Sequence, residues 1–260
     1  MKLLVAVKHV PDTETKVRVA SDGVSLDEAG VKFILSPYDE FALEEALRIR
    51  EARGGAVVLV CAGGESATAT LRQGLAMGAD RAVLVRHDGF DRADGLGRAR
   101  VLAAFARTES PDLILMGKYG VGTDENQTGP MLAEILDLPH AAAVSKLELG
   151  PKTFTAHREI EGAVEVMEGT LPALITCEKG LNEPRYASLK GIMAAKKKSI
   201  EVKTVLDLGC DPADLGAGAR VIWESMELPP GRAAGRILEG DPSEAARELA
   251  RLLREEARVI

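Results

Sequence analysis

Short, nearly continuous apolar runs alternate with stretches of helical periodicity through the first half of the chain. Such runs are typical of strands that are covered on both faces of a sheet, and they occupy residues 3–7, 56–61, 82–85 and 113–116. Amphipathic helices are predicted between them, where apolar residues recur with helical spacing: residues 37–47, 68–77 and 96–107. This alternation predicts an α/β fold with a doubly wound, mostly parallel sheet and right-handed crossovers.

The pattern changes after residue 140. Alternating segments predict an antiparallel addition to the sheet, and the run at 174–177 is expected to return to the sheet; the alternating segments are residues 145–149, 153–157 and 163–171. Residues 206–235 have scattered Gly, Pro and Ala, which favours an extended arm, with a flexible linker as the alternative. Asp241 begins a capped amphipathic helix. We therefore divide the chain into an α/β domain, residues 1–200, and a C-terminal arm and helix, residues 201–260.

The helix predicted after residue 36 has a well-marked beginning. Ser36 suits the N-cap, Pro37 suits the first helical position, and Asp39 is placed to reach back and complete a capping box. Farther along this helix, Glu44 and Arg48 have the spacing of a surface ion pair.

Composition narrows the function classes. Of 260 residues, 46% are hydrophobic and 28% are charged, which is typical of a folded globular protein. Only 3% are aromatic and the net charge is -7, so the chain is a poor candidate for binding nucleic acid or an anionic membrane. No apolar run approaches the ~20 residues of a membrane span. Three widely spaced cysteines, with no leader pattern, indicate a reducing cytoplasm and no metal site.

A glycine-rich segment follows the strand predicted at residues 113–116. It covers residues 117–130 and leads into a predicted helix at residues 131–136. Glycines let backbone amides approach a ligand, Asn126 and Thr128 add side-chain donors, and the helix N-terminus attracts an anion. Open α/β sheets bind ligands at this end of their strands. The segment predicts a nucleotide phosphate site; a loop without a ligand is the alternative. No Walker or GxGxxG motif supports triphosphate hydrolysis.

A second segment looks like a recognition surface rather than a catalytic one. Leu189, Ile192 and Met193 stand beside polar residues and the basic run 196–198, as an apolar anchor stands within a polar rim. The alternative is that these side chains pack underneath the segment. The four histidines fit no triad or metal motif, so no catalytic residue is predicted.

Several motifs in order together resemble the electron transfer flavoprotein β-subunit family over essentially the whole chain. The motifs are Val5-Ala6-Val7-Lys8, residues 76–81, Asn126-Gln127-Thr128-Gly129, the stretch 156–176 with Arg158, Glu161, Gly162, Glu165 and Pro172, and Asn182-Glu183-Pro184-Arg185-Tyr186 followed by Leu189, Ile192, Met193 and Lys196-Lys197-Lys198.

The resemblance implies an electron carrier subunit rather than an enzyme. It implies a heterodimer with an α subunit that holds most of the redox FAD, a structural AMP on this chain, and a C-terminal arm that packs on the partner subunit. It further implies electron donors such as acyl-CoA dehydrogenases of fatty acid β-oxidation, and a membrane quinone oxidoreductase as acceptor. The chain itself is not expected to insert into the membrane.

The resemblance also assigns residues by position. The implied nucleotide contacts are Ala6, Ser36, Pro37, Tyr38, Asp39, Cys61, Gly117, Lys118, Gly120, Val121, Gly122, Thr123, Asp124, Glu125, Asn126, Gln127 and Thr128. The implied partner contacts are Tyr186, Leu189, Ile192 and Met193, with Leu189 as the anchor in a dehydrogenase pocket. Near the flavin, Tyr38 keeps the family's aromatic residue, whereas Thr13 occupies the other aromatic position.

Two other readings remain open from the sequence. A bifurcating relative binds a second FAD in place of AMP, but its loop resembles Asp-Gly-Asp-Thr-Ala-Gln, whereas residues 124–128 here are of the AMP type. A universal-stress-type ATP-binding module has a similar glycine-rich loop. Its glycine spacing is missed by one residue, Pro130 stands where Ser or Thr is expected, and it leaves the recognition segment unexplained.

Overall fold

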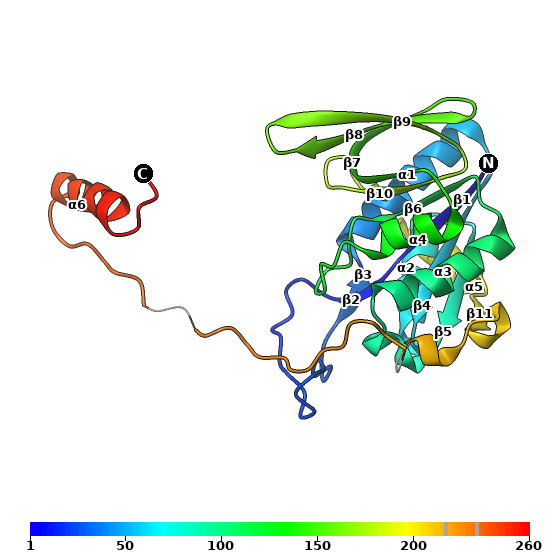
Figure 1. Cartoon of the computed structure of the whole chain (residues 1–260), viewed down its shortest axis with the longest axis horizontal. Coiled ribbons are helices and arrows are strands. Elements are labelled where there is room, and N and C mark those ends of the chain that lie inside the picture. Colours follow the sequence, from blue (N-terminus) through cyan, green and yellow to red (C-terminus); the bar gives the residue numbers. More distant parts are fainter. Residues whose placement is uncertain (216–217, 232–233) are drawn as a thin grey trace. The chain divides into compact units, whose positions relative to one another are not determined.

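The structure is a computed structural model that describes residues 1–215, 218–231 and 234–260. The chain forms two compact units, Met1–Met226 and Glu227–Ile260, and each is described by itself. Among the described residues, no helix is long and apolar enough to cross a membrane. The strands of the first unit form a large sheet with helices on both faces (Figure 1). The predicted α/β fold with a mostly parallel sheet is therefore confirmed.

The described strands of the main sheet follow the order β11-β5-β4-β1-β6-β10-β7-β8-β9. The run from β11 to β7 is parallel, and only the pairs β7–β8 and β8–β9 are antiparallel. The bounds are β1 Lys2–Ala6, β4 Ala56–Gly63, β5 Arg81–Arg86, β6 Leu113–Gly117, β7 His140–Leu149, β8 Thr153–Ile160, β9 Ala163–Thr170, β10 Ala173–Cys177 and β11 Glu201–Thr204. A separate antiparallel pair joins β2 His9–Pro11 to β3 Phe33–Leu35.

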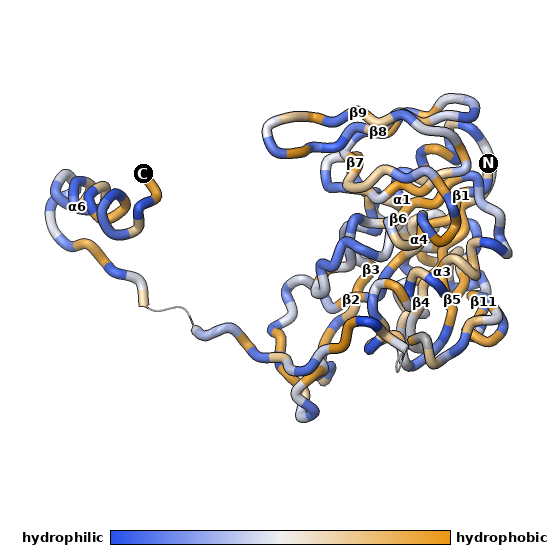
Figure 2. Tube along the Cα trace, in the orientation of Figure 1, coloured by the Kyte–Doolittle hydropathy of each residue, from blue (hydrophilic) through white to orange (hydrophobic). Residues whose placement is uncertain are grey.

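Alternation along the central strands sends side chains to two cores, one on each face of the sheet. In β1, Leu3 and Val5 enter one core, and Leu4 and Ala6 enter the other. The first core packs against α1 Pro37–Arg53, α2 Thr68–Met77 and α5 Leu189–Lys197. The second packs against α3 Gly95–Glu109 and α4 Thr128–Leu136. Because both faces of the central strands are covered, their sequences are nearly continuous in apolar residues. The apolar colour in Figure 2 accordingly concentrates on these strands.

Strand β7 connects the parallel sheet to its antiparallel addition. Its first half pairs with β10, where Leu174 lies opposite His140, and its second half pairs with β8, where Leu149 lies opposite Phe154. The predicted antiparallel addition and the return of residues 174–177 to the sheet are confirmed. The hairpin of β8 and β9 carries exposed apolar side chains: Val164 and Val166 on one face, and Ile160 on the other.

After β11 the chain continues through two short 3-10 helices, Leu206–Leu208 and Pro212–Leu215. Leu215 is buried and Val221 is exposed, so residues 201–226 contain both packed and open segments of the first unit. The second unit contains α6, Pro242–Glu255, whose N-cap is Asp241 as predicted; its carboxylate accepts a hydrogen bond from the Ser243 amide. No residue of α6 is buried.

Candidate functional site

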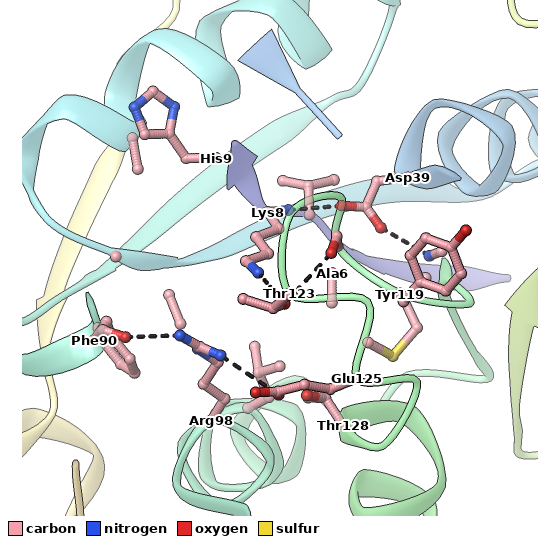
Figure 3. A pocket seen from close by; sticks show the side chains of 18 of the residues that line it. Ala6, Lys8, His9, Asp39, Phe90, Arg98, Tyr119, Thr123, Glu125 and Thr128 are labelled. Carbon is pink, nitrogen blue, oxygen red and sulfur yellow. Dashed lines mark hydrogen bonds and ion pairs between the residues drawn. The ribbon is translucent and has the colours of Figure 1, made fainter. Parts of the chain in front are cut away.

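A cavity lies at the carboxyl ends of the central parallel strands, where chains leaving β1, β4 and β6 meet the first turns of α3 and α4 (Figure 3). Among the implied nucleotide contacts, the structure places these in the cavity wall: Ala6, Asp39, Gly117, Lys118, Gly120, Thr123, Glu125, Asn126, Gln127 and Thr128. Outside the wall are Ser36, Pro37, Tyr38, Cys61, Val121, Gly122 and Asp124. The wall also contains residues with no predicted role, among them Lys8, Phe90 and Arg98.

Asp39 ties two strand ends together at the cavity. Its Oδ2 accepts a hydrogen bond from the Lys8 amide at 2.7 Å, and its Oδ1 accepts one from the Gly117 amide at 2.8 Å. Burial raises the pKa of Asp39 to about 7, although the hydrogen bonds from both amides oppose that rise. A Cβ at Gly117 would lie 2.6 Å from Asp39 Oδ1, so only glycine permits this approach.

The predicted capping box at Ser36 is therefore wrong. Ser36 is the N-cap and Pro37 begins α1 as expected, but the Ser36 side chain makes no capping hydrogen bond. Asp39 instead reaches across to the ends of β1 and β6, where it accepts from the amides of Lys8 and Gly117. The Ser36 hydroxyl is left buried without a hydrogen-bond partner within the described structure, which marks a place for a further polar group.

The side chain of Lys8 holds the glycine-rich loop by a hydrogen bond. Its ammonium donates a hydrogen bond to Thr123 Oγ1 at 2.8 Å. A Cβ at Gly120 would lie 2.2 Å from Lys8 Cδ, so Gly120 makes room for this side chain. Burial lowers the pKa of Lys8 to about 8, and the nearby Arg98 charge adds to the fall.

The loop from residue 117 to residue 128 contains residues in the left-handed backbone region at alternate positions. Gly122, Asp124 and Asn126 have φ angles of 98°, 48° and 50°, and alternating left-handed residues turn successive amides toward one side, which favours an anion. Thr128 then begins α4, whose N-cap Gln127 makes no side-chain capping hydrogen bond. The amides at this helix start therefore remain available to a ligand.

Arg98 enters the cavity from the fourth position of α3. Its guanidinium donates to the Phe90 carbonyl at 2.9 Å and lies 3.9 Å from a Glu125 carboxylate oxygen. A cation near a helix N-terminus opposes the helix dipole. That placement within the predicted helix 96–107 is the sequence signal by which Arg98 could have been found.

An aromatic pair borders the loop. The Tyr119 hydroxyl donates to the Tyr38 hydroxyl at 3.1 Å, and the ring centroids are 4.5 Å apart. The Lys118 ammonium lies 5.1 Å from the Tyr38 ring centroid and 4.9 Å from the Tyr119 ring centroid. It also lies 2.5 Å from a Glu178 carboxylate oxygen. Burial raises the pKa of the Cys61 thiol to about 12, which disfavours the thiolate form.

The recognition segment, residues 181–198, presents apolar side chains to solvent. Tyr186, Leu189, Ile192 and Met193 are exposed by 99%, 76%, 41% and 60%. The alternative in which Leu189, Ile192 and Met193 pack underneath the segment is therefore wrong. Ser188 caps α5 by accepting a hydrogen bond from the Gly191 amide at 3.0 Å.

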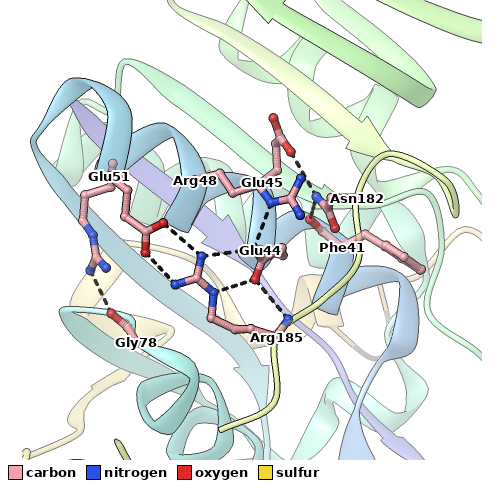
Figure 4. Close-up of polar contacts among 9 residues, drawn as sticks. Phe41, Glu44, Glu45, Arg48, Glu51, Gly78, Asn182 and Arg185 are labelled. Atoms are coloured by element: carbon pink, nitrogen blue, oxygen red, sulfur yellow. Dashed lines mark hydrogen bonds and ion pairs between the residues drawn. The ribbon is translucent and has the colours of Figure 1, made fainter. Parts of the chain in front are cut away.

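The same segment is anchored on α1 by a buried charge (Figure 4). Arg185 donates from Nε to Glu44 Oε2 at 2.8 Å and from Nη2 to Glu44 Oε1 at 3.0 Å, and it also pairs with Glu51 at 2.5 Å. Asn182 donates to the Phe41 carbonyl and to Glu45, each at 3.0 Å. These contacts hold the exposed residues in place from behind.

Of the two arginine contacts of Glu44, the sequence predicts only the one with Arg48. The predicted pair with Arg48 is present at 3.0 Å, but Glu44 is buried rather than on the surface. Burial alone would raise the pKa of Glu44, yet the hydrogen bonds from Arg185 and Arg48 hold that pKa below its ordinary value. The spacing of more than a hundred residues between Glu44 and Arg185 leaves no local pattern from which to predict the contact.

Comparison with known proteins agrees with this arrangement. The electron transfer flavoprotein domain profile matches residues 23–208. The electron transfer flavoprotein subunit beta of Bacillus subtilis is 42% identical over 261 residues, covering all of both chains. The same-named subunit of Bradyrhizobium diazoefficiens is 44% identical over 90% of this chain and 92% of its own length. The human one is 42% identical over 92% and 93%.

These matches decide against the universal-stress-type alternative, since they extend through the recognition segment as well as the glycine-rich loop. The chain belongs to the electron transfer flavoprotein β-subunit family.

Proposed function

We propose that the cavity binds one structural AMP, and that the chain works in a heterodimer whose α subunit holds most of the redox FAD. The chain is then an electron carrier subunit with no catalytic residue of its own. Its donors are flavin dehydrogenases such as acyl-CoA dehydrogenases, and its acceptor is a membrane quinone oxidoreductase. We place this assembly in the cytoplasm.

The loop from residue 117 to residue 128 carries the nucleotide proposal. Its left-handed residues, its glycines and the uncapped start of α4 provide amide donors for a phosphate. The Ser36 hydroxyl has no hydrogen-bond partner within the described structure, although Ser36 lies outside the cavity wall. A monophosphate needs no metal and no catalytic base in such a cradle, so these residues fit AMP.

Residues of this chain bind and orient the nucleotide rather than transform it. Asp39 fixes the ends of β1 and β6, and Lys8 fixes Thr123 in the loop, so the amide donors are held in place before the nucleotide binds. AMP supplies binding energy to the folded state, whereas FAD supplies the redox chemistry of the assembled dimer. Tyr38 lies beside Tyr119 at the edge of the cavity and is the aromatic residue proposed to face the flavin.

The recognition segment is proposed to dock the electron donors, with Leu189 entering a pocket of the dehydrogenase. A carrier that serves several partners must bind briefly and release, and a small apolar contact gives weak affinity and fast dissociation. The segment meets both needs, because its apolar residues are exposed while Arg185 and Asn182 secure it to α1.

The C-terminal part is proposed to pack on the α subunit. Exposed apolar side chains continue along it, among them Val221, Ile222, Trp223, Ile237 and Leu249. In α6, apolar residues share one face and polar residues the other. A face of this kind is stabilised when a partner covers it.

The test is the identity of the nucleotides released by boiling the purified heterodimer. We expect one AMP and one FAD per dimer, and a colourless β chain when it is expressed alone. Two FAD per dimer with no AMP would replace the proposal by the bifurcating alternative. Stoichiometric FAD on the isolated chain would contradict the placement of the flavin on α.

A further inference from the structure

The C-terminal arm begins with a segment that is held by its backbone. Among the described residues, Leu215 is the last one that is buried in a core. Shortly after it, the Arg220 and Val221 amides both donate to Asp94 Oδ2, at 2.6 Å and 3.2 Å. We call residues 220–226 the arm strip, and Asp94 holds its first two residues.

Asp94 binds two different parts of the chain, one with each carboxylate oxygen. Oδ1 accepts a hydrogen bond from the Gly97 amide at 2.8 Å and caps α3, and Oδ2 accepts from the arm strip. Asp94 is only 7% exposed. Burial alone would raise its pKa, yet the amides of Gly97, Arg220 and Val221 hold that pKa below its ordinary value. The group that holds the arm strip is therefore an ionised carboxylate, which forms strong hydrogen bonds with amides.

The arm strip is fixed at both of its ends. Two successive amides that meet at one oxygen bend the backbone toward it, and residues 220–221 form such a bend. At the other end, the Met226 amide donates to the Gly23 carbonyl at 2.8 Å. The path of the chain here follows from hydrogen bonds of its backbone rather than from buried side chains.

The same strip exposes three consecutive large apolar side chains. Val221, Ile222 and Trp223 are exposed by 58%, 69% and 53%. Adjacent apolar side chains of this size in water favour a partner that covers them. A segment with no buried side chain is also released at low cost once its hydrogen bonds are lost. The Asp94 contact therefore controls where these three side chains are presented.

We propose that Asp94 is a positioning residue for heterodimer assembly: its Oδ2 fixes the arm strip so that Val221, Ile222 and Trp223 meet the α subunit in one defined arrangement. This inference rests on the proposed packing of the C-terminal part on the α subunit. It adds a residue of the α/β domain, 126 positions before Arg220 in the chain, that prepares the arm for that contact.

The α subunit is the partner that suits this strip. Exposed apolar side chains continue along the chain from Trp223 to Leu228, Ile237 and Leu249, and α6 has no buried residue. One partner can thus cover a continuous run of sequence. A segment that is already fixed loses little conformational entropy when it binds, whereas a released segment has to be ordered first. Loss of the Asp94 contact should therefore weaken assembly.

The experiment measures the dissociation constant between the full-length chain and immobilised α subunit, with AMP and FAD in excess. Serine is a favoured helix cap, so Asp94→Ser retains a cap for α3, but its single oxygen cannot also accept from the arm strip. We expect the affinity for the α subunit to fall about tenfold. The melting midpoint of the isolated chain and its AMP affinity should match those of the control.

Asp112→Ser is the matched control, because the Asp112 carboxylate also accepts from a backbone amide, that of Lys2 at 2.6 Å, at the amino ends of β1 and β6. It should leave the affinity for the α subunit unchanged. Arg220→Pro removes the closer of the two donors without altering α3. It should weaken assembly as Asp94→Ser does, and it keeps the test valid if Asp94→Ser folds poorly.

A double-mutant cycle distinguishes positioning from a general loss of structure. Ile222→Ala and Trp223→Ala together remove most of the apolar contact, and the affinity should fall by about tenfold or more. In that background Asp94→Ser should lower the affinity by less than about threefold, because little remains to be positioned. Strictly additive effects would show that Asp94 does not act through the arm strip.

Trp223 supplies a readout besides affinity, because it is the only tryptophan in the chain. Labelling the chain with fluorotryptophan therefore places a single fluorine probe in the arm strip. Its NMR resonance should shift when unlabelled α subunit binds, and the difference between its shifts in H₂O and D₂O should disappear. An unchanged resonance in the wild-type heterodimer would overturn the contact between the arm strip and the α subunit.

The outcomes separate this inference from the proposal on which it rests. Unchanged affinity in both Asp94→Ser and Arg220→Pro would overturn the positioning role and leave the packing on the α subunit standing. A chain that ends at Ala219 and still binds the α subunit with full affinity would overturn the packing itself, and the positioning role with it.

Discussion

Helix α1 supports two regions of opposite character, and a buried acid connects it to each. At its first turn Asp39 faces the nucleotide cavity, and its carboxylate is held by backbone amides. One and a half turns later Glu44 faces the recognition segment, and its carboxylate is held by Arg185 and Arg48. The cavity is lined by backbone and by both polar and apolar side chains, whereas the recognition segment presents apolar side chains to solvent.

Because their partners differ, the pKa values of the two acids are shifted in opposite directions. Amides only partly offset the cost of burying a charge, so the pKa of Asp39 is raised to about 7. The arginines more than offset burial, so the pKa of Glu44 is lowered. In the cavity the buried acid is held by backbone amides, whereas the segment that presents side chains outward is held on its inner side by a charged pair.

Breaking the inner contact of the recognition segment should have the largest effect. Arg185→Met leaves the buried Glu44 with Arg48 and the main-chain amide of residue 185 but without the Arg185 guanidinium. We expect the free energy of unfolding to fall by ~3 kcal/mol, as when one partner of a buried pair is removed. Electron transfer from a dehydrogenase should fall with it. Chemical denaturation of the dimer measures the loss. Adding Glu44→Gln should restore part of it, and strictly additive effects would contradict the pairing.

Asp39→Asn tests the other acid and should have the next largest effect. The amide retains one acceptor oxygen, and its NH₂ group then opposes the amide of Lys8 or Gly117. A buried unsatisfied donor costs ~2 kcal/mol, which corresponds to a melting midpoint lower by roughly 4–8 °C. Bound nucleotide should also be lost. Glu134→Gln, an exposed acid on α4, is the control, and equal midpoints for the two variants would refute the role of Asp39.

The raised pKa of Asp39 makes a pH-dependent difference between these variants. A carboxyl whose folded pKa is raised contributes stability that is present at low pH and lost as pH rises through about 7. The advantage of the nucleotide-free wild type over Asp39→Asn should therefore shrink between pH 5 and pH 8, by at most ~1.4 kcal/mol per pH unit. Thermal melts across that range measure it, and a constant difference would show that Asp39 is already ionised.

Leu189→Ala should have the smallest effect on the fold and a selective effect on docking. Leu189 is exposed by 76%, so its truncation should change unfolding by less than ~0.5 kcal/mol. Electron acceptance from a dehydrogenase should fall about tenfold, equivalent to ~1.4 kcal/mol, while flavin content and dithionite reduction stay normal. Ala194→Gly, a neighbouring exposed position of α5, controls for helix stability. Undiminished electron acceptance in a stable Leu189→Ala variant would contradict the proposal that Leu189 is the anchor.

The two regions also differ in how much their sequences reveal. The cavity loop and the strand before it are contiguous, so apolar runs and glycines predict both the parallel sheet and the end of the sheet at which the cavity lies. The recognition segment stood out because Leu189, Ile192 and Met193 are apolar among polar neighbours. Contacts between distant parts of the chain have no local pattern. The prediction that Asp39 caps its own helix and the prediction that Glu44 lies on the surface are therefore wrong. Lys8 and Arg98 meet the loop only after folding.

The open C-terminal helix has a consequence for how cells handle the chain before assembly. Since α6 has no buried residue and its unit contributes little core, a β chain without its α subunit exposes a tail that proteases can recognise and cleave. If the α subunit covers this helix as proposed, assembly removes that signal, and surplus subunit is degraded while completed dimers persist. Limited proteolysis should accordingly shorten the isolated chain within residues 227–260 and spare the same residues in the heterodimer.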